Sequence, residues 1–116
     1  MNIGMRCLQA ALLGTALQLP LHATAGNQVA TISRIAINKT KGAMAFIRLS
    51  LAPNTPAACS TDSYWHFTVP LVTDLDKEVY NILVRAHASG RQVYIYGDNV
   101  CNDIATVESV FAVTAL

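Results

Sequence analysis

The distribution of apolar residues after position 25 predicts five β-strands and one helix. The expected strands span residues 29–38, 43–51, 64–69, 91–97 and 104–113, and all but 43–51 are rich in β-branched or aromatic residues. Residues 29–38 do not alternate cleanly, as expected of a long, bent strand. In 43–51 the apolar residues alternate well, which places Ala45, Ile47, Leu49 and Leu51 on one face. The proline-rich and polar residues 52–63 predict a loop.

The one helix is expected over residues 73–89. Its apolar residues recur at the spacing of a single buried stripe, namely Leu75, Val79, Ile82, Leu83 and Ala86. Thr73 is placed to cap the start, and Gly90 is placed to end the helix in a left-handed conformation.

The resulting order, β-β-β-α-β-β, is that of an OB-fold, a small β-barrel with one helix between its third and fourth strands. An open α+β sheet with the same order is the alternative. The sequence contains no linker or internal repeat, so we expect a single domain over residues 26–116.

Residues 1–25 have the order of a secretory signal peptide. Arg6 is followed by an apolar stretch over 7–21 and then by Ala23-Thr24-Ala25, with small residues where a signal peptidase requires them. The apolar stretch is short for a membrane span and contains Pro20. We therefore expect an exported protein, periplasmic or secreted, that begins at Gly26 and retains no membrane span.

Charge argues against a nucleic-acid partner. The chain has eight basic and seven acidic residues, and Arg6 leaves with the expected signal, so the mature domain is formally neutral. Nucleic-acid binding requires a basic patch.

Two of the three cysteines remain in the mature chain. Cys59 and Cys101 form one even pair in the oxidising compartment that an exported protein reaches, which predicts a disulfide. Closing a loop of this length stabilises a fold by about 4 kcal/mol in the chain-entropy model. The pair lacks the C-x-x-C spacing of a redox-active site, so a structural role is expected.

The segment between these cysteines carries a family resemblance. Its features are, in order, Cys59, the aromatic run Trp65-His66-Phe67, a helix with Tyr80, Leu83 and Ala86, the run Gly90-Arg91-Gln92-Val93-Tyr94-Ile95, and Cys101. This order resembles the B subunits of subtilase cytotoxin and typhoid toxin. The resemblance implies an OB-fold, assembly as a ring pentamer and binding of sialylated glycans. The family's glycan-contacting serine has no direct match, but Ser33 and Arg34 lie in its neighbourhood.

The sequence carries no catalytic or cofactor motif, and we expect neither enzyme activity nor a cofactor or metal. His66 is interpreted as solvent-facing or packed in the barrel, and His87 as a favourable charge at the helix C-terminus. Acidic residues at the helix start are interpreted as helix-stabilising charges rather than metal ligands; they are Asp74, Asp76 and Glu78.

Tyr94 and Tyr96 share the strand face opposite Val93 and Ile95, and one of these two faces must look outward. Outward tyrosines offer apolar area and a hydroxyl for a ligand or a neighbouring subunit. The main hypothesis is an exported, non-enzymatic binding module for a glycan or protein. The alternative is a periplasmic structural or inhibitory protein that binds one protein partner.

Overall fold

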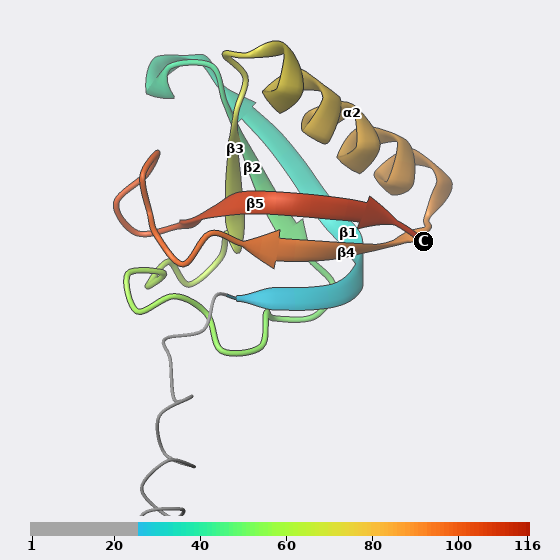
Figure 1. Cartoon of the computed structure of the whole chain (residues 1–116), viewed down its shortest axis with the longest axis horizontal. Helices are drawn as coiled ribbons and strands as arrows, with labels where there is room; N and C mark the ends of the chain where they lie inside the picture. Colours follow the sequence, from blue (N-terminus) through green and yellow to red (C-terminus); the bar gives the residue numbers. More distant parts are fainter. Residues whose placement is uncertain (1–25) are drawn as a thin grey trace, which may run out of the picture.

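The computed structural model describes residues 26–116, and the expected signal peptide over 1–25 lies outside this range. The described chain forms one five-stranded sheet and one long helix, which confirms the predicted order (Figure 1). The strands are β1 (Asn27–Asn38), β2 (Met44–Leu49), β3 (Phe67–Pro70), β4 (Gln92–Gly97) and β5 (Glu108–Ala115), with the helix α2 (Asp74–Ser89) between β3 and β4. A short 3-10 turn, η1 (Lys39–Lys41), joins β1 to β2.

The sheet closes on itself in the order β1-β2-β3-β5-β4, with β4 pairing back onto β1. All pairs are antiparallel except β3 and β5, which run parallel. Each strand thus has two neighbours. Every strand edge is paired over at least part of its length. The alternative of an open sheet is wrong.

β1 is long because it pairs with two strands, β4 and β2. Its first half pairs with β4 and its second half pairs with β2, and the register shifts between Ile32 and Arg34. Ser33 is the residue at this irregularity, where a bulge increases the local bend. The predicted long, bent strand is confirmed.

The helix has both predicted caps. The Thr73 hydroxyl accepts a hydrogen bond from the Asp76 amide at 3.1 Å, and the Asp76 carboxylate accepts one from the Thr73 amide at 3.0 Å. Gly90 ends the helix with a φ of +67°. Leu83 and Ala86 are buried, but Leu75 is 73% exposed and does not belong to the buried stripe. Leu75 lies in the first turn of the helix.

The core fills the closed sheet and the space beneath the helix. Its buried members are Ala30, Ile32, Ala45, Ile47, Leu49, Phe67, Val69, Leu83, Ala86, Val93 and Ile95. Ala45, Ile47 and Leu49 of β2 face the core as predicted, and Met44 and Phe46 between them are buried as well. Leu51, expected on the same buried face, is 58% exposed because the strand has already ended there.

The strand boundaries that differ most from the prediction are the starts of β3 and β5. β3 starts at Phe67 rather than Tyr64, because the Asp62 carboxylate accepts hydrogen bonds from the amides of Tyr64 and Trp65 at 2.8 Å each. These amides are therefore not available for strand pairing. β5 starts at Glu108 rather than residue 104, because the chain turns between Ile104 and Val107.

The predicted disulfide between Cys59 and Cys101 is present. It joins the β2–β3 loop to the β4–β5 loop, which lie side by side at the end of the sheet away from α2 (Figure 1). The amides of Thr61 and Asp62 add hydrogen bonds to the Thr106 carbonyl, both at 3.0 Å. Both loops are therefore fixed to each other.

The fully buried carboxylate of Glu108 strengthens this end of the sheet. It accepts hydrogen bonds from the backbone amides of Gly26 (3.0 and 3.3 Å), Ala57 (2.9 Å) and Asn99 (2.9 Å). A Cβ atom on Gly97 would lie 1.9 Å from Glu108 Oε2. Only glycine at position 97 leaves room for the carboxylate.

We expect Gly97→Ala to destabilise the domain by at least about 2 kcal/mol, since the displaced carboxylate would leave buried amides without partners. Gly42→Ala is the matched control, because Gly42 has a φ of +77° but nothing within 4 Å of an added Cβ. It should cost only about 1 kcal/mol. Urea unfolding under non-reducing conditions measures both, and equal losses would contradict the role given to Gly97.

Candidate functional site

A surface pocket of about 370 Å³ brings together the two candidate residues of β1 and three side chains from elsewhere in the chain. Its lining includes Ser33 and Arg34 from β1, Tyr64 and Trp65 from the segment before β3, and His87 from the end of α2. We call this the β1 pocket. Sequence reasoning proposed the two β1 residues but did not place the aromatic pair or His87 beside them.

The β1 bulge sets the geometry of one wall of the β1 pocket. The Ser33 hydroxyl donates to the Arg48 carbonyl at 3.1 Å, which fixes the side chain toward β2. The next residue, Arg34, is exposed. On the other side of the bulge, His87 Nδ1 lies 2.9 Å from the Ile32 carbonyl oxygen, so the end of α2 is held against β1.

Aromatic stacking builds the opposite wall. Trp65 packs against Phe46 with a ring-centroid distance of 5.6 Å and forms a T-shaped pair with Tyr64 at a centroid distance of 4.9 Å. The Arg48 guanidinium lies 4.3 Å from the centre of the Tyr64 ring and donates to the Tyr64 carbonyl at 2.7 Å. Tyr64 thus contacts both an indole and a cation, while 39% of its surface stays exposed.

The β1 pocket therefore combines aromatic surface with positive charge. Arg34 is one of its lining residues, and the Arg48 guanidinium stacks on the Tyr64 ring of its wall. The nearby carboxylate of Asp62 already accepts from two backbone amides. A ligand that offers both an apolar face and a negative group would fit this combination.

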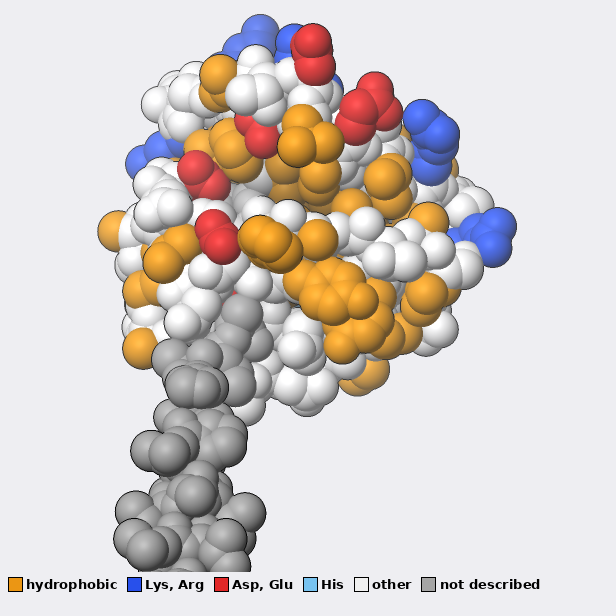
Figure 2. Space-filling view, in the orientation of Figure 1, with side chains coloured by type: hydrophobic (Ala, Val, Ile, Leu, Met, Phe, Trp, Pro, Cys, Tyr) orange, Lys and Arg blue, Asp and Glu red, His pale blue; other side chains and the backbone are white. Residues whose placement is uncertain are grey.

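A second aromatic surface lies on the outside of β4. Tyr94 and Tyr96 stack with centroids 4.2 Å apart and planes within 7°, while Val93 and Ile95 are fully buried on the opposite face. The predicted division of the two faces is confirmed. Figure 2 shows hydrophobic side chains gathered over β4 and β5, with most charged groups around them.

Phe111 extends this second surface and was missed by sequence reasoning. Tyr96 pairs with Ala112 and Gly97 pairs with Val110, which leaves Phe111 unpaired in a bulge of β5. Its side chain is 72% exposed. We call Tyr94, Tyr96 and Phe111 the tyrosine face. A lone Phe in an apolar strand gives no signal of exposure, because the bulge that turns it outward depends on pairing with β4.

His66 is half-buried and holds β2 to the segment before β3. Its Nδ1 atom accepts a hydrogen bond from the Leu49 amide at 3.0 Å, which requires a neutral ring. Burial lowers the pKa of His66, and the positive charge of Arg48 lowers it further, against an opposing effect of Asp62. The interpretation of His66 as a packed histidine agrees with these contacts.

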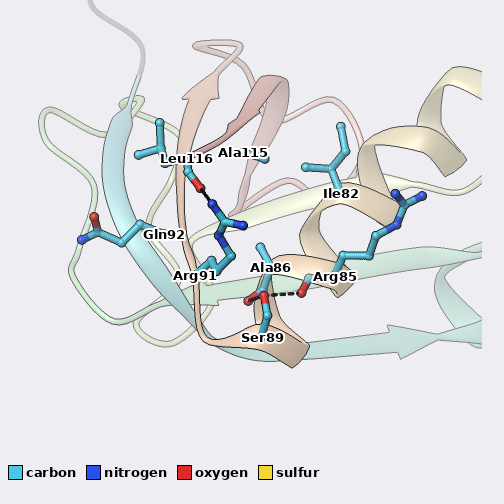
Figure 3. A pocket seen from close by; sticks show the side chains of 8 residues that line it. All are labelled: Ile82, Arg85, Ala86, Ser89, Arg91, Gln92, Ala115 and Leu116. Atoms are coloured by element: carbon cyan, nitrogen blue, oxygen red, sulfur yellow. Dashed lines mark hydrogen bonds between the residues drawn. The ribbon is translucent and has the colours of Figure 1, made fainter.

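A further cavity of about 330 Å³ lies between the end of α2 and the ends of β4 and β5 (Figure 3). Arg91 lines it and donates to the Leu116 carbonyl at 2.7 Å, and Ser89 donates to the Arg85 carbonyl at 2.9 Å. These contacts are internal, and the lining contains no acidic side chain.

The remaining candidate residues have local structural roles. Asp76 belongs to the helix capping box, and Asp74 is exposed in the first turn. Among residues 26–116 no three histidine, cysteine or acidic side chains are grouped to hold a metal ion. Within the same range no helix is long and apolar enough to cross a membrane.

No protein-family model matches the chain, and comparisons with curated proteins and with solved structures also find no match. The resemblance to toxin B subunits therefore stays a prediction.

Because the pKa of His66 is lowered in the folded state, the unfolded chain binds more protons below the ordinary pKa of 6.5. Stability should be fully present above pH 6.5 and decrease as the pH falls toward the folded-state pKa. In His66→Asn an amide oxygen can replace Nδ1 as the acceptor without titrating. Between pH 7.5 and 5, we expect the melting temperature to depend less on pH in this variant than in the wild type. The same pH dependence in both proteins would contradict the assignment.

Proposed function

We propose that the protein is an exported, non-enzymatic binding module that recognises an anionic glycan through the β1 pocket. The observation that carries this proposal is the convergence of Ser33 and Arg34 with Tyr64 and Trp65 at one pocket. These residues come from segments far apart in the sequence. Their side-chain types are those that bind a sugar carrying a carboxylate.

The chemistry of each group supports a sialylated ligand, as the resemblance to toxin B subunits implies. A guanidinium such as that of Arg34 can bind a carboxylate through two parallel hydrogen bonds. The rings of Tyr64 and Trp65 offer flat apolar surface to the C–H face of a sugar. Ser33 already donates to a backbone carbonyl, and its oxygen keeps lone pairs that can accept from a sugar hydroxyl.

The proposed scaffold is an OB-fold barrel. The closed strand order and the helix between β3 and β4 support it, and OB-folds bind oligosaccharides as well as oligonucleotides. The formally neutral mature domain favours the saccharide. Export is supported by the disulfide, which persists in oxidising compartments, together with the signal-like pattern of residues 1–25.

The tyrosine face supports a second candidate function, binding of a protein partner or of further copies of this chain. Because the sheet closes, no strand has one edge free along its whole length, so assembly would use side-chain surfaces. Stacked tyrosines and an exposed phenylalanine are typical of such contacts. The resemblance implies a homopentamer, and the alternative role as a periplasmic structural or inhibitory protein would use the same face.

Glycan-array binding tests the proposed ligand. We expect sialylated glycans to bind and their desialylated counterparts to bind weakly. Arg34→Gln should weaken binding about tenfold to a hundredfold, because a hydrogen bond to a charged group contributes about 1.5–3 kcal/mol. Trp65→Phe should also weaken binding while keeping an aromatic ring against Phe46.

Lys77→Gln is the matched control, because it removes one exposed positive charge on α2 and should leave glycan binding unchanged. Tyr94→Ala and Tyr96→Ala should also bind normally if the β1 pocket is the ligand site. Loss of binding only in these tyrosine variants would move the site to the tyrosine face. No binding across a broad array would remove the glycan proposal.

The mass of the mature protein in solution tests assembly. Light scattering under non-reducing conditions should give a pentamer, and Phe111→Ser should shift the protein toward smaller species because it removes exposed apolar surface. Asn81→Ala is the control, since it changes an exposed polar residue on α2, outside the tyrosine face. A monomer at all concentrations would contradict the ring, and pull-down from envelope extracts would then test for a single protein partner.

A further inference from the structure

The fully buried side chain of Glu108 has an unusual set of partners. Within the described part of the chain, all the hydrogen bonds that its carboxylate accepts come from backbone amides: Gly26, Ala57 and Asn99. Buried carboxylates are commonly paired with a cation, because removing a charge from water is costly. Backbone amides supply only partial charges.

One of these donors, the Gly26 nitrogen, would gain a full positive charge if the chain were cleaved just before it. The Gly26 nitrogen lies 3.0 Å from Oε2 and 3.3 Å from Oε1, so it faces both oxygens of the carboxylate. Gly26 is also the residue that follows Ala23-Thr24-Ala25, the expected cleavage signal.

We propose that Glu108 is the binding site for the α-ammonium group that signal-peptide cleavage creates on Gly26. This inference rests on the proposed export. A signal peptidase would hydrolyse the Ala25–Gly26 amide bond with one water molecule. Ala25 leaves as a carboxylate, and the Gly26 nitrogen becomes an amine that is protonated at neutral pH. The same nitrogen that donates as an amide then carries the charge that balances Glu108.

The space around the carboxylate fits this role. A Cβ atom on Gly26 would lie 2.7 Å from Glu108 Oε1 and 3.2 Å from the Pro56 Cα atom. A glycine therefore allows the new terminus to approach the carboxylate closely. The Gly26 carbonyl also accepts from the Gly97 amide at 2.6 Å, which holds the residue in place.

Cleavage would then stabilise the domain by completing an ion pair. The uncut chain keeps the Gly26–Glu108 hydrogen bonds but lacks the charge. The ion pair would link the terminus, the β2–β3 loop and the β4–β5 loop at one point. The folded state is thus expected to be more stable after export than before it.

Four purified proteins test the pair. One protein begins at Gly26 and one begins at Ala25, both with Glu108 present. The other two have the same two first residues and carry Glu108→Gln. The extra Ala25 moves the ammonium by one residue and leaves an amide on Gly26. We expect this extension to lower the melting temperature by on the order of 10 °C when Glu108 is present, and by little in Glu108→Gln.

Asp98→Asn is the control, because it removes an exposed carboxylate from the adjacent loop. The effect of the extension should be unchanged in this variant. An extension effect of equal size in Glu108→Gln, or no effect in the wild type, would overturn the pairing and leave Glu108 as a hydrogen-bond acceptor only.

Amine acylation gives a second measurement that does not depend on folding of Glu108→Gln. With surface lysines as the internal standard, the α-amine of the Gly26 protein should react at least about tenfold more slowly than that of the Ala25 protein, because an ion-paired amine is protonated and shielded. Equal rates would overturn the proposal.

The intact mass of the protein exported from the full-length chain separates this inference from the glycan proposal. A mass that begins at Gly26 supports the pairing, and another first residue overturns it. Neither result bears on glycan binding, which the array measures independently.

Discussion

The carboxylate of Glu108 joins three segments that are distant in the sequence: the chain entering β1, the β2–β3 loop and the β4–β5 loop. Its burial is possible because Gly97 carries no side chain that would occupy the same space. The Cys59–Cys101 disulfide joins the same two loops covalently. A small domain buries too little apolar surface to order long loops by packing alone, so these polar and covalent links have a large effect on its structure.

The other end of the sheet is organised by local interactions. The helix begins at a reciprocal cap between Thr73 and Asp76 and ends at Gly90. Both caps involve residues close in sequence, so they form wherever the helix forms. Tertiary packing then places Leu83 and Ala86 against the core. The helix end of the sheet therefore depends on contacts between residues close in sequence. The Glu108 end depends on contacts between segments far apart in the sequence.

This difference explains how much the sequence predicts. The helix, its caps, the order of the strands along the chain, the disulfide and the inward faces of β2 and β4 follow from spacing and composition. The start of β3 does not, because the Asp62 carboxylate accepts hydrogen bonds from the Tyr64 and Trp65 amides. The strand pattern assigns both amides to strand pairing. The burial of Glu108 is equally hidden, because a glutamate in a strand is normally exposed and its partners are backbone groups. The exposure of Phe111 depends on a bulge that only strand pairing defines.

The β1 pocket depends on both ends. Ser33 and Arg34 are placed by the bulge in β1, and His87 is brought to them by the end of the helix. Tyr64 and Trp65 belong to the chain just after the loop that the disulfide holds, and Asp62 fixes their backbone. The Asp62 amide in turn donates to the β4–β5 loop at Thr106. The links that stabilise the domain thus also position the aromatic wall of the proposed ligand site. Reducing the disulfide would therefore be expected to weaken ligand binding even where the closed sheet itself survives.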